Sequence, residues 1–188
     1  MGYVGKKPTA APLTASDVTD GIITTAKIAD DAVTTAKAAF SPGKVLQVVS
    51  TTKTDTFSGT STSFADVTGL SVAITPSSTS NKVFITANFV VSNGSGARSM
   101  YFNLLRGSTD IAQPDTPDTN DCTIQCNTQV ASSGIEVAKI SFLDTPSTTS
   151  ATTYKIQYKQ DSGTTYVGRR GDSDQRSVST ITAYEIAG

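Results

Sequence analysis

The residue types that carry most enzyme chemistry are scarce in this chain. The sequence contains no His, and its only Glu residues are Glu136 and Glu185. Without an imidazole, the usual Ser–His–Asp and Cys–His nucleophilic sites cannot be built, and the commonest transition-metal ligand is missing. Two carboxylates could still hydrolyse a glycosidic bond, but neither Glu has an acidic neighbour in the sequence. We therefore expect two solvated strand residues, no catalytic residue and no cofactor, and keep a polysaccharide depolymerase as the alternative from another functional class.

The two cysteines, Cys122 and Cys126, stand four residues apart. In a strand they would point to the same face about 13 Å apart, which is too far for a disulfide between them. Two Cys without His do not make a zinc site within one chain. We interpret them as two small, half-buried residues. A bond between subunits is the alternative, which assembly in a reducing cytoplasm disfavours.

Acidic residues crowd the segment DIAQPDTPDTND, which holds Asp110, Asp115, Asp118 and Asp121. Carboxylate oxygens can bind calcium, but this spacing is not that of a calcium-binding loop. Two Pro residues and the polar content favour a solvated loop without a metal. Because exposed irregular loops often carry recognition, Asp115 and Asp118 are candidate receptor contacts.

A second candidate binding segment is Arg169-Arg170-Gly171-Asp172, which contains the tripeptide RGD. Gly between charged residues is also typical of an ordinary turn. Together with Tyr166, Arg169 and Arg170 could contact a sugar, because aromatic faces stack on sugar rings and Arg binds acidic groups. The alternative is the end of a hairpin with no ligand.

The elements that must position these residues begin with a repeat. Residues 13–42 divide into LTASDVTDGI, ITTAKIADDA and VTTAKAAFSP, each with two apolar positions five residues apart. Such a short unit cannot bury its apolar side alone. It suits a thin rod in which identical chains bury these positions against each other. The expected oligomer contacts are Ile23, Ile28 and Val33.

The first residues of the chain are rich in Gly and Pro. A segment of this kind can lie extended on a larger surface, and a disordered tail is the alternative. Thr24 and Thr34 could each cap a short helical turn. The predicted attachment residues are Tyr3, Val4, Leu13 and Val18.

After Ser41-Pro42-Gly43 the pattern changes to strands. Apolar and polar residues alternate with period two, most clearly where Tyr154, Ile156 and Tyr158 alternate with polar residues. The strand-like segments are 45–49, 70–74, 83–91, 100–104, 138–142, 154–158, 166–167 and 176–186. Eight or so strands without a long helix predict an antiparallel β-sandwich of jelly-roll type. The predicted organisation is an extended repeat segment with short helical turns over residues 1–43 and a sandwich domain over residues 44–188.

Charge and hydropathy exclude other partners. The net charge is −1 and 16% of residues are charged, without the basic stripe that nucleic acids or anionic membranes require. The sequence contains no run of 18 apolar residues, so it predicts no membrane span. It also shows no charged segment followed by an apolar one, so we expect no secretory signal. We expect a protein that folds in the cytoplasm where it is made.

The order of these segments resembles that of bacteriophage virion proteins, especially fibre proteins of phages that infect marine bacteria and cyanobacteria. The matching pieces run from MGYVGKKP and the repeats, through GKVLQVVS and GLSVAITPSSTSNKVFI, to FNLLRGSTDIA, SFLDTPSTTSATTYKIQYK and STITAYEI. The resemblance implies a homotrimeric virion protein, attached to tail or capsid proteins by its N-terminus. Its β-sandwich tip would be free to bind host surface polysaccharide.

The resemblance leaves the place in the virion open, because tail fibres and capsid fibres use similar parts. A chain of 188 residues is short for a tail fibre, which favours a short fibre, an adaptor or a capsid decoration protein. Because the hosts of such phages are bacteria, we do not adopt the reading of RGD as an integrin ligand.

Overall fold

The computed structural model describes residues 43–95, 98–115, 120–127, 134–171 and 175–188. These residues form β-strands, turns and loops, and none of them is helical. Within this part of the chain no helix is long and apolar enough to span a membrane. The predicted attachment and oligomer residues lie outside the described residues, as do the predicted helical turns: Tyr3, Val4, Leu13, Val18, Ile23, Ile28 and Val33.

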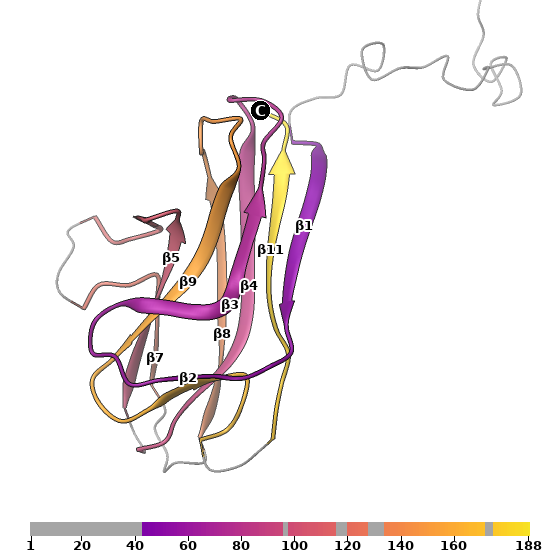
Figure 1. The fold of residues 1–188 in the computed structure, drawn as a ribbon. Coiled ribbons are helices and arrows are strands. Elements are labelled where there is room, and N and C mark those ends of the chain that lie inside the picture. The colour runs from indigo at the N-terminus through magenta and orange to yellow at the C-terminus, as the bar shows by residue number, and fades with distance from the viewer. Residues whose placement is uncertain (1–42, 96–97, 116–119, 128–133, 172–174) are drawn as a thin grey trace, which may run out of the picture. The chain divides into compact units, whose positions relative to one another are not determined.

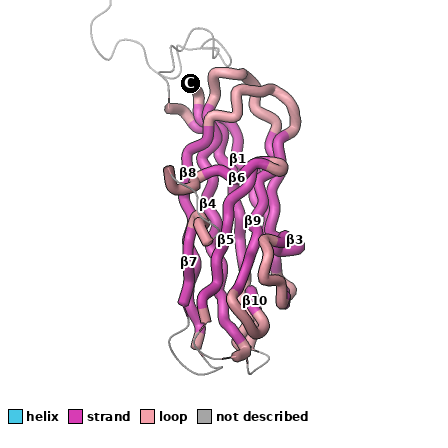
Figure 2. Tube along the Cα trace, turned by 90° about the vertical axis from the view of Figure 1, so that its left-hand side faces the viewer, coloured by secondary structure: helices cyan, strands magenta, loops and turns pink. Residues whose placement is uncertain are grey.

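Two antiparallel sheets make up the described domain (Figures 1 and 2). Sheet A contains β1 (Val45–Lys53), β2 (Phe57–Gly59), β4 (Lys82–Asn93), β8 (Ile135–Asp144), β10 (Thr165–Val167) and β11 (Ser179–Ile186). Sheet B contains β3 (Ala65–Ile74), β5 (Ser99–Arg106), β6 (Thr109–Ile111), β7 (Ile124–Asn127) and β9 (Thr152–Gln160).

The strand order is that of a jelly roll. In sheet A, β11 and then β10 pair with one edge of β4, β8 pairs with the other edge, and β1 pairs with β11. In sheet B the order is β3-β9-β5, with β6 and β7 both paired to β5. The chain changes sheet at nearly every long connection, as two interlocked Greek keys require. The predicted all-β, jelly-roll sandwich is therefore confirmed.

Buried and more exposed residues alternate along the strands, and the buried ones form the core between the two sheets. On β9, Tyr154, Ile156 and Tyr158 are buried while the residues between them are half-buried. The rings of Phe89 on β4 and Phe102 on β5 meet edge to face, with centroids 5.1 Å apart. All the predicted strand segments overlap observed strands, whereas the short strands β2, β6 and β7 were not predicted.

The sandwich has two distinct ends. The chain enters it at Gly43, whose N–H donates to the carbonyl of Ala187 at 2.8 Å, so the entering chain and the C-terminus share what we call the proximal end (Figure 1). From there β4 runs from Lys82, paired with Ile186, to Asn93, paired with Thr165. Its length, on the order of 35 Å, separates the proximal end from the distal end.

Candidate binding surfaces

The outer face of sheet A carries an apolar row near the proximal end. Four side chains lie side by side across four strands in register: Val48 on β1, Tyr184 on β11, Phe84 on β4 and Leu143 on β8. The relative exposure of Val48 is 55% and that of Leu143 is 48%, while the two aromatic rings between them are 6.0 Å apart, centroid to centroid. Val45 and Leu46, at the start of β1, extend the exposed apolar surface. We call these six residues the apolar row.

A polar belt follows along the same face. The next outward row consists of Ser50, Thr182, Thr86 and Ser141. Ser50 Oγ and Thr182 Oγ1 lie 2.8 Å apart and share a hydrogen bond. Beyond this belt, towards the distal end, the outward residues turn apolar again at Val90 and Val137. The belt separates the apolar row from a second surface feature.

That second feature is built on a hairpin at the distal end of sheet A. Gly168 N–H donates to the Val90 carbonyl, and Ser177 N–H donates back to the Gly168 carbonyl. The backbones of Arg169 and Arg176 pair in an isolated antiparallel β-bridge. Gly168 has φ +76°, and a Cβ there would lie 3.1 Å from the Ser177 carbonyl oxygen. The sequence therefore needs glycine where the hairpin leaves the sheet. This anchorage holds consecutive arginines beside the end of β4.

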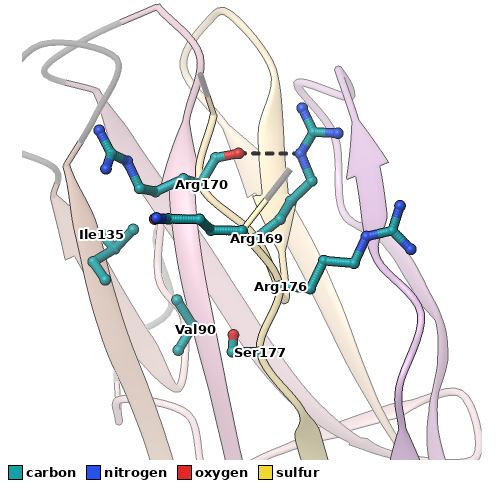
Figure 3. A pocket seen from close by; sticks show the side chains of 7 residues that line it. Val90, Ile135, Arg169, Arg170, Arg176 and Ser177 are labelled. Carbon is teal, nitrogen blue, oxygen red and sulfur yellow. Dashed lines mark hydrogen bonds between the residues drawn. The ribbon is translucent and has the colours of Figure 1, made fainter. Parts of the chain in front are cut away.

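The hairpin and the adjacent strands form an open pocket of about 210 Å³ (Figure 3). It is lined by Val90, Ile135, Arg169, Arg170, Gln175, Arg176 and Ser177, which we call the arginine pocket. Val90 and Ile135 supply apolar surface, and the Ser177 hydroxyl is buried without a hydrogen-bond partner among the described residues. The lining thus combines three cations, an apolar wall and a hydroxyl group.

The structure brings together three of the five predicted receptor residues. The Arg169 guanidinium carbon lies 4.3 Å from the centre of the Tyr166 ring, and Arg169 Nε donates to the Arg170 carbonyl at 3.1 Å (Figure 3). Tyr166 therefore holds Arg169 in place by a cation–π contact. Asp115 does not join them, because it is exposed in the segment between β6 and β7 of sheet B. Asp118 and Asp172 lie outside the described residues.

The outer face of sheet B is different in kind. The Lys155 ammonium contacts the Asp66 carboxylate at 2.8 Å, and Gln157 donates to the same carboxylate at 2.7 Å. These hydrogen bonds, from Lys155 first and then Gln157, lower the pKa of Asp66. Lys159 donates to Asn120 in the segment that precedes β7. The charged side chains named here thus have their partners within the same chain.

Glu185 is buried, so the expectation of a solvated strand residue was wrong. Its exposure is 1%, and its carboxylate accepts hydrogen bonds from the side chains of Gln47, Ser77 and Asn81 and from Ser77 N–H. Burial acts to raise the pKa of Glu185, but these hydrogen bonds outweigh it and lower the pKa to about 2. A carboxylate satisfied in this way ties β1, β11 and the turn before β4 together.

Glu136 is half-buried, and its carboxylate accepts from Asn127 N–H at 2.8 Å. Each Glu is therefore engaged with backbone or amide groups, and the structure gives neither an acidic partner among the described residues.

Cys126 is buried at 1% exposure rather than half-buried, whereas Cys122 is half-buried as expected, and both are free. Burial, chiefly, raises the pKa of the Cys126 thiol to about 12, which leaves it unreactive. The described residues contain no cluster of His, Cys, Asp or Glu that could hold a metal ion.

An ion pair between a buried carboxylate and a half-buried Arg, which the sequence did not indicate, joins the two sheets. Asp144 at the end of β8 contacts Arg106 of β5 at 2.8 Å and accepts from the Tyr154 hydroxyl of β9 at 2.7 Å. Burial and the hydrogen bond to Asp144 raise the pKa of Tyr154. The three residues are 38 and 10 positions apart in the chain, so no local pattern could have revealed their contact.

Comparison with known proteins gives structural similarity only. No family model and no curated protein sequence matches the chain. Among solved structures, the chain is similar to PRD1 vertex protein P5, with 14% identity, a TM-score of 0.43, and coverage of 77% of this chain and 99% of that one.

It is also similar to the Eiger TNF structure from S. frugiperda, with 7% identity and a TM-score of 0.34 over 77% of this chain and 94% of that one. For infectious bursal disease virus, Gx strain, the identity is 14% and the TM-score is 0.34, over 76% of this chain and 37% of that one. At TM-scores below 0.5 these similarities assign neither a family nor a function to the chain.

Proposed function

We propose that the protein is a non-enzymatic structural component of a phage virion. In this proposal three copies form a short fibre or spike, residues 1–43 attach it to other virion proteins, and the distal end of the sandwich meets the host surface. The observation that carries the proposal is the apolar row, a band of exposed and half-buried apolar side chains across four strands.

The occupant that best fits this row is a second copy of the chain. Contiguous apolar surface on a soluble protein usually marks an interaction site, and an antiparallel sheet with one free face normally places polar residues there. The row lies at the proximal end, where the chain arrives from repeats that themselves require identical partners. Association of the repeats and association of the sandwiches would therefore reinforce each other. Closed symmetry favours a small ring of copies, and the family resemblance favours three.

The distal end suits a tip because it is farthest along the strands from Gly43. Tyr166, Arg169 and Arg170 gather there, and nothing in their arrangement points to bond-breaking chemistry. A depolymerase would need a pair of carboxylates about 5 to 9.5 Å apart with access to a sugar. Glu185 is buried and fully engaged instead.

The experiment that tests the proposal is the solution mass of the full chain beside residues 43–188, by light scattering after size exclusion. A full-chain mass of three times 19.5 kDa is expected, and a truncated protein that remains oligomeric would assign the contact to the sandwich. A full chain that is monomeric at every concentration would overturn the trimeric fibre. That outcome would favour a capsid decoration protein in which each copy attaches by its own N-terminus.

A further inference from the structure

The apolar row begins and ends on two different edge strands of sheet A. Among the described strands, β1 pairs only with β11 and β8 pairs only with β4, so each of the two stands at an edge (Figure 1). Of the four side chains in register, those on the edge strands are the more exposed, at 55% for Val48 and 48% for Leu143. Tyr184 and Phe84, between them, are half-buried. The row is therefore most open to solvent at its two ends.

The outward side chains of the two edge strands match in kind at each height along the strands. Residues directly opposite each other on antiparallel strands lie at one height, so the pairings through β11 and β4 place Val48 and Leu143 level with each other. At the next two heights both edges are polar: Ser50 with Ser141, then Thr52 with Lys139. If β1 of one copy lies beside β8 of another at the same height, apolar residues meet apolar ones and no like charges oppose each other.

The strand directions also suit this contact. β1 is antiparallel to β11, β11 to β4 and β4 to β8, so β1 and β8 run in opposite directions. A rotation about an axis parallel to the strands keeps each residue at its height, and it brings β1 of one copy beside an antiparallel β8 of the next. Every contact in such a ring joins two different edges, as an assembly with threefold symmetry requires.

The point where the chain enters the sandwich favours this axis over one that crosses the strands. Gly43 lies at the proximal end, bonded to Ala187, and the 42 residues before it include the three repeats. A twofold axis across the strands, which would join β8 to β8, places Gly43 of the two copies at opposite ends, separated by the length of β4, on the order of 35 Å. An axis along the strands places Gly43 of every copy at the same end, so the repeats of all copies begin together.

We infer that the apolar row is a two-part contact between copies of this chain, in which Val48 on β1 of one copy meets Leu143 on β8 of the next. Val45 and Leu46, exposed at the start of β1, extend the contact. Because both side chains project from the outer face of sheet A, they meet only where these faces turn towards the common axis. This inference rests on the proposed function, because it specifies how the proposed copies touch.

The test is cross-linking of the full chain in a background that carries Cys122→Ser, which removes the half-buried thiol. The reagent is a short bifunctional maleimide that cannot span the three strand spacings, about 14 Å, between β1 and β8 of one copy. With Val48→Cys and Leu143→Cys in the same chain, each contact carries two thiols, and a denaturing gel should show products of two and three times 19.5 kDa. Either substitution alone should leave single chains, because identical positions lie on opposite sides of the contact.

The matched control combines Val48→Cys with Val137→Cys. Val137 has the same exposure as Val48, 55%, and shares the outer face of β8 with Leu143. It lies six residues nearer the distal end, about 20 Å away along the strand, so this variant should give no cross-linked product. Light scattering before the reaction shows that each variant has kept the mass of the wild type.

Three results would overturn the inference: an oligomer that stays uncross-linked in the double variant, equal cross-linking in a single variant, or as much product with Val137→Cys as with Leu143→Cys. Cross-linking of Leu143→Cys alone would indicate a β8–β8 contact about a twofold axis across the strands. The masses separate this inference from the proposed function. Products that stop at two chains keep the Val48–Leu143 contact and contradict three copies, whereas a wild-type mass of one chain contradicts both.

Discussion

The two sheets differ in how far the apolar side chains on their outer faces are covered. On sheet B, Tyr101 and Leu105 lie on the outer face of β5, away from the core. They are nevertheless buried, with relative exposures of 7% and 3%. The segment between β6 and β7 hydrogen-bonds to this face, with Thr123 N–H donating to Asn103. On sheet A, Val48 and Leu143 stay about half exposed. Sheet B uses its own chain to cover apolar side chains, and sheet A leaves apolar side chains exposed.

The largest effect is expected from charges placed in the apolar row. Val48→Asp with Leu143→Asp puts two carboxylates where the proposal requires apolar contact between copies. Because burying an unpaired carboxylate costs several kcal/mol, association should weaken at least about a thousandfold. Light scattering should then give the mass of one chain. Both residues are exposed in the subunit, so its fold should survive.

The matched control for this variant carries the same charges on sheet B. Thr153 and Gln125 are exposed on β9 and β7, and Thr153→Asp with Gln125→Asp should leave the mass unchanged. If the sheet B variant dissociates while the sheet A variant does not, the two faces have been assigned in the wrong order. If both retain the full mass, the repeats alone hold the copies together.

The next effect is on folding, at the ion pair that joins the sheets. Asp144→Ala leaves the Tyr154 hydroxyl buried without its acceptor and Arg106 without its carboxylate. The free energy of unfolding should fall by about 3–4 kcal/mol, measured by urea denaturation. Tyr154→Phe removes one hydrogen bond and should cost about 1 kcal/mol. A loss below 1 kcal/mol in the Ala variant would show that Asp144 does not brace the sandwich.

The sequence predicted the fold better than the binding surfaces, for a physical reason. Period two separates inward from outward residues on each strand, so the alternation at Tyr154, Ile156 and Tyr158 was sufficient to place them in the core. The apolar row itself depends on register: Val48 and Leu143 are 95 positions apart, and only the pairing through Tyr184 and Phe84 aligns them.

Polar side chains were predicted less well because their partners are remote in sequence. Glu185 lies on the same face of β11 as the buried Ile181 and Ala183, and the partners that satisfy its carboxylate there, Gln47, Ser77 and Asn81, are remote in sequence. Tyr166 and Arg169 were grouped correctly because they are three positions apart across one turn. Asp115 was predicted as a receptor contact because it falls in an exposed irregular loop, and the topology puts that loop on the other sheet.

Glu185 also gives sheet A a pH dependence. Its pKa of about 2 lies below the ordinary value of 4.5, so the unfolded chain binds the proton more tightly. Stability from this group is therefore complete above pH 4.5 and falls as the pH decreases towards 2, by up to about 3 kcal/mol. In Glu185→Gln this part of the decrease should disappear from denaturation curves measured between pH 2 and 5. An unchanged acid profile would contradict the depressed pKa.

The smallest effect is expected where sheet B carries its exposed ion pair. Lys155 and Asp66 have side-chain exposures of 25% and 51%, so water screens their attraction and Lys155→Met should change the free energy of unfolding by less than about 1 kcal/mol. Because the hydrogen bond from Lys155 is the main cause of the low pKa of Asp66, an NMR titration of the variant should show that pKa moving up. The mass should stay that of the wild type, since this pair serves the sheet B face rather than a contact between copies. A variant that loses its oligomeric state would show that the charged face, and not the apolar row, holds the copies together.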